Sequence, residues 1–280
     1  VGRKVRLKID KQESKAGNIL LNVDKLRYVD GSGVERVKSV SFSVRAGEVV
    51  GIAGVSGNGQ SELLELLSGI IKPASGSFTV AEHQVSADSP VDAAMMREYG
   101  MGHVPEDRHK MGLINKFSAQ EAFVLGYHNH PMYNRGLLQD KKAILQDCQE
   151  KMDKWDVRPA NPQLKTANFS GGNQQKLVIA REVEKNPDVL LIGQPTRGVD
   201  IGAIEFIHKQ IVAMRDAGKA VLLVSVELDE ILSLSDRILV MFDGQVVGEI
   251  SAAQADEKTL GLMMANIVPE HLQVKQGDHQ

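Results

Sequence analysis

The feature that most constrains the fold is a glycine-rich stretch between an apolar run and a helix-like run. EVVGIAG at residues 48–54 has the apolar continuity of a buried strand, and QSELLELL at residues 60–67 has the composition of a helix. Glycines between such elements let backbone N–H groups curl around phosphate oxygens, and the helix adds the positive end of its dipole. The pattern therefore predicts a strand, a phosphate-binding loop and a helix, in that order.

The loop departs from the usual phosphate-binding pattern at one position. Its frame, G-x-x-x-x-G-x-S, places Gln60 where a P-loop has the Lys that reaches the terminal phosphates. Gln is neutral and shorter, so we expect the loop to keep its shape and lose its cation. For the loop alone, a tight strand-to-helix turn without a ligand is an equally good interpretation. The candidate nucleotide contacts are Gly54, Ser56, Gly57, Asn58, Gly59, Gln60 and Ser61, with Ser61 also a weak magnesium ligand.

Composition and charge limit the classes of protein to consider. A net charge of −3 over 280 residues provides no basic field, so no nucleic-acid partner is expected. A single cysteine, Cys148, excludes a disulfide framework and an all-cysteine metal site. No apolar run approaches the roughly 20 residues that a membrane-spanning helix needs. His128 and His130 alternate in a polar stretch, which favours adventitious metal binding over a built metal site.

Short apolar runs alternate with helical patterns along the chain. Residues 19–55 contain several β-rich runs, and the polar stretch at residues 139–155 is expected to be a solvated helical face. The other expected strands lie at residues 189–192, 220–226, 238–242 and 246–250, and the other expected helices at residues 174–184 and 203–217. This alternation predicts an α/β fold with a largely parallel core sheet.

A second glycine motif opens one of these helices. Ser170, Gly171 and Gly172 come directly before a predicted helix, so they offer a helix N-terminus to an anion. Taken alone, the triplet is better explained as an ordinary Ser cap. It is followed, however, by the helix, by the apolar strand VLLI and by the turn QPTRGVD. This succession of motifs favours an anion-binding role for the triplet over that of a simple helix cap.

The ordered motifs resemble those of ABC-transporter ATPase subunits. FSGGNQQK at residues 169–176 is similar to the family signature LSGGQ, with Asn173 in place of the Gln. VLLIGQPT at residues 189–196 falls where the family has its Walker B strand, and RGVD at residues 197–200 falls on the D-loop. A set of motifs in this order is highly specific for the family.

Two further parts of the chain fit the resemblance. GHVPEDR at residues 102–108 falls on the Q-loop, with Glu106 at the Gln position, and Tyr28 lies where the family stacks an aromatic ring on adenine. Tyr28 is explained equally well as a core strand residue. Glu106 and residues 117–127 lie where the family contacts its transmembrane permease, although a surface loop and helix explain any one of these residues as well.

The resemblance covers residues 18–268 and implies a complete fold. That fold is a P-loop NTPase of the ABC ATPase type, with a mostly parallel core sheet, an N-terminal antiparallel β subdomain and an α-helical signature subdomain at about residues 107–185. Residues 1–17 are then an inter-domain linker, and residues 269–280 are a tail. ATP and Mg²⁺ are the implied cofactors, and ATP hydrolysis is the implied family activity.

The resemblance also implies that the hydrolysis site of this chain is degenerate. Gly193 stands where the family has a magnesium-binding Asp, Gln194 where it has the Glu that polarises the attacking water, and Val226 where it has the switch His. Together with Gln60, these positions lack the polar and charged groups that the family has around the phosphates. Phosphoryl transfer depends on such groups being held at fixed positions. A Gln can hydrogen-bond a water but is not a useful base. We therefore expect ATP binding with very poor hydrolysis.

The signature residues Ser170, Gly171 and Gly172 are intact, and in the family they complete a nucleotide site whose loop belongs to another domain. VGRK at residues 1–4 resembles the end of a first nucleotide-binding domain, and the longer phrases resemble simple-sugar importers, above all those for purine nucleosides. The chain is thus expected to be the C-terminal half of a tandem ATPase at the cytoplasmic face of the membrane. The implied partners are the first domain of the same polypeptide, permease subunits and, indirectly, a substrate-binding lipoprotein.

Two other functions stay open. One is a self-sufficient ABC ATPase homodimer, against which the missing Lys and carboxylates count. The other is a non-transport protein of the same fold that acts in translation or DNA repair, against which the importer-like motifs count. A small GTPase is not supported, because the Asn-Lys-x-Asp motif that reads the base is absent.

Overall fold

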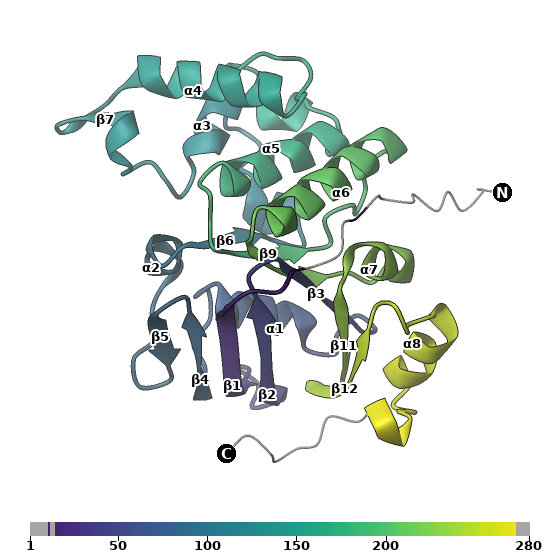
Figure 1. The fold of residues 1–280 in the computed structure, drawn as a ribbon. Coiled ribbons are helices and arrows are strands. Elements are labelled where there is room, and N and C mark those ends of the chain that lie inside the picture. Colours follow the sequence, from purple (N-terminus) through teal and green to yellow (C-terminus); the bar gives the residue numbers. More distant parts are fainter. Residues whose placement is uncertain (1–10, 12–14, 273–280) are drawn as a thin grey trace. The chain divides into compact units, whose positions relative to one another are not determined.

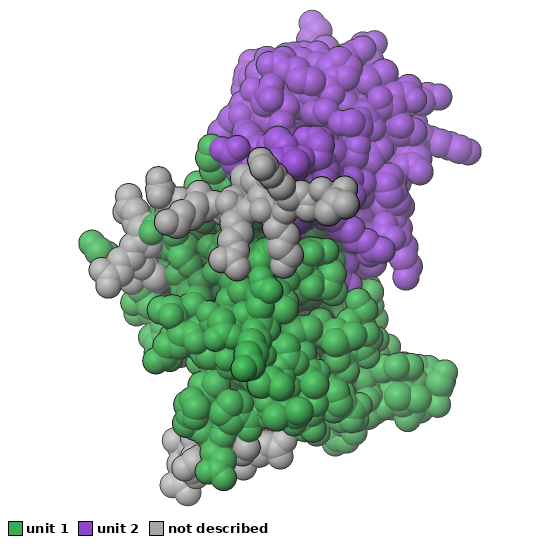
Figure 2. Space-filling view, turned by 90° about the vertical axis from the view of Figure 1, so that its right-hand side faces the viewer, with its two compact units in different colours: residues 1–103, 187–194, 208–280 green, residues 104–186, 195–207 purple. Residues whose placement is uncertain are grey.

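The computed structural model describes residue 11 and residues 15–272. It divides into two compact units (Figure 2). Unit 1 comprises residues 1–103, 187–194 and 208–280, and unit 2 comprises residues 104–186 and 195–207. Within the expected linker and tail, residues 1–10, 12–14 and 273–280 lie outside the described residues. No helix in the described part of the chain is both long and apolar enough to span a membrane.

A six-stranded sheet in the order β12-β11-β3-β10-β9-β6 forms the centre of unit 1 (Figure 1). Its strands are β3 (Glu48–Ala53), β6 (Met101–Val104), β9 (Val189–Gly193), β10 (Ala220–Val224), β11 (Arg237–Phe242) and β12 (Gln245–Ser251). β10 pairs in parallel with β3 and with β9, β11 pairs in parallel with β3, and β12 is antiparallel to β11. The predicted mostly parallel sheet is confirmed, and β3, β9 and β10 are buried along their whole length, as continuous apolar strands in such a sheet are.

The second sheet of unit 1 is antiparallel, in the order β2-β1-β4-β5. Its strands are β1 (Ile19–Val29), β2 (Glu35–Arg45), β4 (Ser75–Val80) and β5 (His83–Ser86). Asp30 shapes the turn between β1 and β2, because its Oδ1 accepts hydrogen bonds from the N–H groups of Ser32 and Val34. The expected N-terminal antiparallel subdomain is thus present, whereas β4 and β5 were not anticipated from the sequence.

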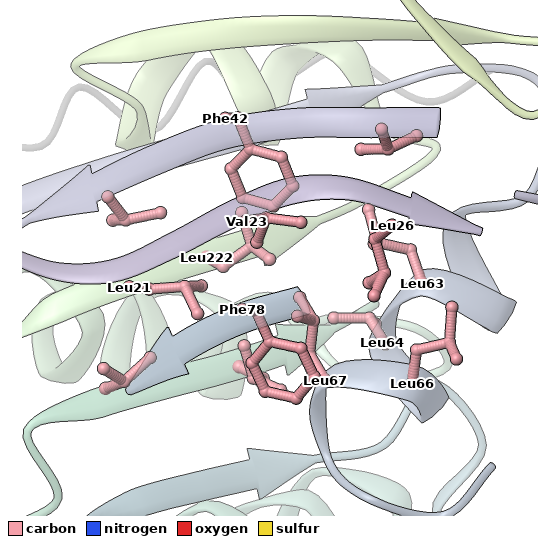
Figure 3. Packing of buried hydrophobic residues seen from close by; sticks show 14 of the residues in the cluster. Leu21, Val23, Leu26, Phe42, Leu63, Leu64, Leu66, Leu67, Phe78 and Leu222 are labelled. Atoms are coloured by element: carbon pink, nitrogen blue, oxygen red, sulfur yellow. The ribbon is translucent and has the colours of Figure 1, made fainter. Parts of the chain in front are cut away.

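Helix α1 (Gln60–Leu67) contributes four leucines to one apolar cluster with the antiparallel sheet. Figure 3 shows the labelled side chains of this cluster, which are Leu21, Val23, Leu26, Phe42, Leu63, Leu64, Leu66, Leu67, Phe78 and Leu222. Full burial of one such side chain stabilises the fold by about 1.5–3 kcal/mol. The cluster therefore fixes the position of α1, and with it the glycine-rich loop that precedes the helix.

Four further helical segments of unit 1 flank its sheets. They are α2 (Ala93–Glu98), α7 (Leu228–Leu234), α8 (Glu257–Met264) and the 3₁₀ turn η4 (Glu270–Leu272). Helix α6 (Ile201–Asp216) begins among the residues of unit 2 and ends among those of unit 1. In unit 1, His208 of α6 and Glu230 of α7 form a buried pair with Nε2 and Oε1 2.8 Å apart.

Unit 2 is mainly helical (Figure 1). Its helices are α3 (Ala119–Val124), α4 (Lys141–Lys154), α5 (Gly171–Val183) and the short segments η1 (Arg108–Gly112), η2 (Pro131–Tyr133) and η3 (Thr166–Asn168), with a small hairpin of β7 (Asn134–Arg135) and β8 (Leu138–Gln139). An α/β fold with a helical subdomain that carries the signature is thereby confirmed. Helix α5 begins at Gly171, three residues before the predicted start, because the Ser170 side chain caps it.

The expectation of a solvated helical face at residues 139–155 is wrong for one side of α4. Asp147, Cys148 and Lys151 are each less than 9% exposed. The Tyr133 hydroxyl donates to Asp147 Oδ2 at 2.6 Å and accepts from Lys185 Nζ at 2.9 Å. Charged side chains are buried here because each finds a partner in the polar network, which the polar composition alone did not reveal.

Candidate functional site

The glycine-rich loop at residues 54–61 joins β3 to α1. Gly57 and Gly59 have φ angles of 90° and 95°, which residues with a side chain rarely adopt. A β-carbon on Gly59 would lie 2.4 Å from the carbonyl oxygen of Arg36, whereas a β-carbon on Gly57 would meet nothing within 4 Å. The loop is therefore packed tightly against β2 at Gly59 and open at Gly57, as a loop that receives a phosphate group must be.

The side chain of Gln60 folds back over the loop. Gln60 is only 5% exposed, and its Nε2 donates to the carbonyl oxygen of Val55 at 3.2 Å. A β-carbon on Gly54 would lie 2.2 Å from the same Nε2, so the amide packs directly on the loop backbone. A neutral group thus occupies the position from which a Lys would supply charge.

A turn of unit 1 holds the outer part of the loop. Asn58 Oδ1 accepts from the N–H of Asp243 at 3.0 Å, and the N–H of Gly244 donates to the Asn58 carbonyl at 3.1 Å. Ser56 is exposed, and Ser61 is half-buried in the first turn of α1. The hydrogen bonds at Asn58 therefore fix the backbone of the loop.

Gln194 links the carboxyl ends of two neighbouring strands. Gly193 ends β9, and the N–H of the following Gln194 donates to the carbonyl of Val224 in β10 at 2.8 Å. Gln194 has a φ of 47° and is 9% exposed, and its Oε1 accepts from the N–H of Val226 at 3.2 Å. Val226 itself is 42% exposed. The structure thus brings together three of the positions that the sequence singled out.

These strand ends and the loop lie at the same edge of the core sheet. β3, β10 and β9 are parallel neighbours, so the segments after their last residues emerge side by side. Ligands of open α/β sheets bind outside the carboxyl ends of the strands. Unit 1 therefore has the arrangement of a nucleotide site, in which the side chains at positions 60 and 194 are the neutral amides of Gln60 and Gln194.

Tyr28 lies in β1 opposite Val37 of β2 and packs partly against the apolar cluster of unit 1. The neighbouring residue of β2, Arg36, is the one whose carbonyl approaches Gly59. Tyr28 is half-buried, so its ring stabilises the strand and also lies along the stretch of β2 that contacts the loop. This placement is compatible with both interpretations of Tyr28.

In unit 2, Ser170 caps helix α5 and is itself oriented by Asn173. Ser170 Oγ accepts from the N–H of Asn173 at 3.4 Å and from its side-chain Nδ2 at 2.9 Å. The Asn173 Oδ1 in turn accepts from the backbone N–H of Arg158 at 2.8 Å. Because the hydroxyl oxygen accepts two hydrogen bonds, its own hydrogen is left for donation elsewhere. The capping interpretation of Ser170 is confirmed, and it leaves the O–H group available to an anion.

Gly171 and Gly172 let the D-loop segment, residues 197–200, lie directly on the first turn of α5. A β-carbon on Gly171 would be 2.6 Å from the Gly198 carbonyl oxygen, and one on Gly172 would be 2.8 Å from Asp200 Oδ2. Real β-carbons do not approach other atoms so closely. The glycines therefore have a packing role that the sequence did not show.

Arg108 is a functional candidate that sequence reasoning did not single out. Its Nη1 donates to the carbonyl of Arg197 at 2.7 Å, its Nη2 to that of Gly198 at 3.4 Å, and its Nε to Gln174 Oε1 at 3.3 Å. Burial lowers the pKa of the Arg108 guanidinium from its ordinary value. The only local signal was its place at the end of the PEDR phrase.

Glu106 lies just before this arginine and is half-buried. The next residue, Asp107, caps the helical turn η1 by accepting from the N–H groups of His109 and Lys110. The backbone hydrogen bond from Lys110 is the main cause of a lowered pKa at Asp107. Glu106 belongs to unit 2 and the glycine-rich loop to unit 1.

The fold, the loop and the capped signature helix together define an ATP-binding cassette, and a sequence comparison agrees. The family described as ABC transporter matches residues 37–197, which is more than half of the chain, and the chain therefore belongs to that family.

Several relatives of this chain are named as import ATP-binding proteins. The chain is 44% identical over 266 residues to the guanosine import ATP-binding protein NupO of Bacillus subtilis, covering 95% of this chain and 51% of NupO. It is 43% identical over 265 residues to the nucleoside import ATP-binding protein NupA of Lactococcus lactis, covering 94% and 52%. It is 38% identical over 266 residues to the glucose import ATP-binding protein TsgD13 of Haloferax volcanii, covering 94% and 48%. The chain spans about half the length of these relatives.

Solved structures support the fold. A nucleotide-free ATP-binding cassette from an ABC transporter superimposes with a TM-score of 0.71 at 21% identity, covering 88% of this chain and 95% of that one. The dimeric cassette MJ0796 bound to ADP and Pi gives a TM-score of 0.69 at 24% identity, covering 83% and 98%. The predicted fold class is confirmed in both comparisons.

Proposed function

We propose that this chain is one ATP-binding domain of an ABC importer, that its own hydrolysis site is degenerate, and that it supplies the signature residues to a second site. The observation that carries the proposal is an asymmetry between the two units. Unit 2 presents an intact and oriented Ser170 with Gly171 and Gly172, whereas unit 1 has neutral side chains or none where phosphoryl transfer needs charge.

The local contacts of unit 1 support a site that turns over very slowly. Gln60 uses its amide on the loop carbonyl of Val55, and Gln194 uses its amide oxygen on the N–H of Val226. Gly193 contributes no side chain for a metal. Removal of one electrostatic group that stabilises the transition state lowers the rate by a factor of about 10²–10³. Several losses in a single site therefore leave little hydrolysis, even though they do not add simply.

ATP and Mg²⁺ fit this chain in part. The open space at Gly57, the start of α1 and the hydroxyl of Ser61 suit phosphate and a weakly held metal, and Tyr28 suits an adenine ring. When bound, Mg²⁺ supplies positive charge to the phosphates. The remaining loop contacts would come from the backbone around Gly54, Ser56, Asn58 and Gly59. Binding without hydrolysis is what this set of groups supports.

The partner that we infer is the first ATP-binding domain of the same polypeptide. Relatives about twice as long as this chain support it, as does the dimeric state of the cassette MJ0796. In this scheme residues 1–17 are the linker, residues 18–268 the domain, about residues 107–185 its helical subdomain and residues 269–280 a tail.

The importer around this ATPase is inferred from the relatives. Their names point to nucleosides, guanosine and glucose, so we propose purine nucleosides or simple sugars as the transported substrate. The domain would bind permease subunits at the cytoplasmic face of the membrane, with Glu106 at the contact, and a substrate-binding lipoprotein would take part indirectly. No nucleic acid is involved.

The test uses the whole two-domain ATPase reconstituted with its permease and receptor. We expect Ser170→Ala to lower ATP turnover at least about tenfold, because one donor to the γ-phosphate is lost. Gln194→Ala should change turnover by no more than about threefold, because that site contributes little hydrolysis. An equal loss in the two variants would refute the asymmetry. Brisk Mg²⁺-dependent hydrolysis by this domain alone would do the same.

A further inference from the structure

Arg108 connects two segments that lie far from it in the sequence. Its guanidinium reaches the carbonyl oxygens of Arg197 and Gly198, 89 and 90 residues away, and Gln174, 66 residues away. All four residues belong to unit 2. One side chain therefore contacts both the D-loop segment and the signature helix α5.

The same guanidinium covers the first turn of α5. A β-carbon on Gly171 would lie 2.9 Å from Arg108 Nη2 and 2.6 Å from the Gly198 carbonyl. The helix tip, the D-loop backbone and the guanidinium are thus in mutual contact, and there is no room for an additional atom at Gly171. The side chain of Asp200 is oriented within its own segment, because its Oδ1 accepts from the N–H of Ala203 at 3.0 Å.

We propose that Arg108 is a positioning residue that clamps the D-loop segment to the signature helix, so that Ser170 and Asp200 reach a partner domain as one rigid surface. The inference rests on the proposed function, in which this surface completes the partner's ATP site.

The geometry calls for an arginine in particular. A guanidinium donates from several N–H groups in a fixed plane, and Arg108 uses three of its nitrogens on three acceptors. A lysine could donate only from its one side-chain nitrogen, so some of the three acceptors would be left without a donor. A hydrogen bond from a charged donor is stronger than one between neutral groups, so loss of one loosens the contact about tenfold.

The experiment compares four variants of the whole ATPase in its transporter: Arg108→Ala, Arg108→Lys, Ser170→Ala and the matched control Arg135→Ala. Arg135 is an exposed arginine of the β7–β8 hairpin whose ion pair with Asp140 lies outside the candidate site. Two quantities are measured. The first is amide hydrogen exchange in peptides covering residues 169–176 and 195–203, and the second is kcat and KM for ATP.

We expect Arg108→Ala to speed hydrogen exchange about tenfold in each of the two peptides. We also expect it to lower kcat about tenfold. Both changes correspond to the loss of one charged hydrogen bond. Arg108→Lys should give an intermediate result for both quantities, and Arg135→Ala should match the unmodified protein. If Arg108→Ala does not fold, the graded result with Arg108→Lys carries the test.

The outcomes separate this inference from the proposed function. Unchanged exchange in the Arg108 variants would overturn the clamp, and so would faster exchange in only one of the two peptides. Unchanged kcat in the Arg108 variants, with a loss in Ser170→Ala, would overturn the positioning role and leave the proposed function standing. Unchanged kcat in Ser170→Ala would refute the proposed function, while the exchange data would still decide whether the clamp exists.

Discussion

The side-chain oxygen of Gln194 accepts a hydrogen bond from the backbone N–H of Val226, with the two atoms 3.2 Å apart. The backbone of Gln194 also donates to Val224, in an unusual conformation with φ at 47°. A neutral amide therefore ties the end of β9 to the segment after β10, at the position where related ATPases are expected to hold a carboxylate. The chemistry of this site can be tested by restoring the charges.

Restoration should need several substitutions at once. We expect Gln194→Glu alone to change hydrolysis less than about twofold, because the other placed charges remain missing. Combining it with Gln60→Lys, Gly193→Asp and Val226→His should raise single-turnover hydrolysis at least about tenfold. The rates are measured in a Ser170→Ala background, which suppresses the partner's site. A single substitution as effective as the combination would contradict the degenerate-site hypothesis.

The glycines of the signature should tolerate no side chain. In Gly171→Ala, the new methyl group would meet the Gly198 carbonyl at 2.6 Å, so the D-loop segment must shift. We expect a loss of about 1–3 kcal/mol of unfolding free energy from the overpacking, together with a fall in ATP turnover of the whole transporter.

Gly261 provides the matched control for that prediction. It lies within helix α8, and a β-carbon there would meet nothing within 4 Å. Gly261→Ala should therefore raise the unfolding free energy by about 0.5–1 kcal/mol and leave turnover unchanged. Denaturant unfolding of both variants measures the contrast, and a stabilised Gly171→Ala would be the contrary result.

The His208–Glu230 pair should show strong coupling. Both residues are buried, at 4% exposure each, and Nε2 lies 2.8 Å from Oε1. His208→Ala should lower the unfolding free energy by about 3 kcal/mol or more, because it leaves a buried carboxyl group without its partner. The double variant His208→Phe/Glu230→Leu should lose less than His208→Ala alone. In the double-mutant cycle of His208→Phe, Glu230→Leu and their combination, additive losses would show that the contact contributes nothing.

Lys185 should make the stability of the chain depend on pH. Burial, followed by the neighbouring Lys151 ammonium, lowers the pKa of Lys185 from 10.5 to about 8. Between these values the unfolded chain holds a proton that the folded chain has released, so rising pH favours the folded state. Lys185→Arg keeps its charge and should lack this gain. Urea unfolding at pH 7.5 and pH 10 should show the native protein gaining stability relative to the variant, and a parallel response of the two proteins would contradict the prediction.

Parts of the fold could be predicted because their causes are local. β9 and β10 are continuous apolar runs, since parallel strands are buried on both faces, and the glycine-rich loop is marked by its own residues. β4 and β5 were missed because their short segments, SGSFTV and HQVS, carry no strong alternation of apolar residues. Their pairing comes from the neighbouring strands and not from their own composition.

The candidate site likewise contains features that could be predicted from the sequence and features that could not. Ser170 could be identified as a helix cap because the cap and the helix adjoin in sequence. The contacts of Arg108 with Arg197 and Gly198 could not be predicted, because nothing in a pattern of adjacent residues encodes a partner 89 or 90 positions away. The packing of Gly171 against the same segment was hidden for the same reason.

The buried thiol of Cys148 has a practical consequence for such experiments. Burial raises its pKa to about 12, so at neutral pH it is almost entirely protonated and a poor nucleophile. It is also the sole cysteine of the chain. A second cysteine placed on an exposed surface of this chain would therefore react with a maleimide dye in preference to Cys148. A fluorescent reporter could then be attached to this domain without first removing the native residue.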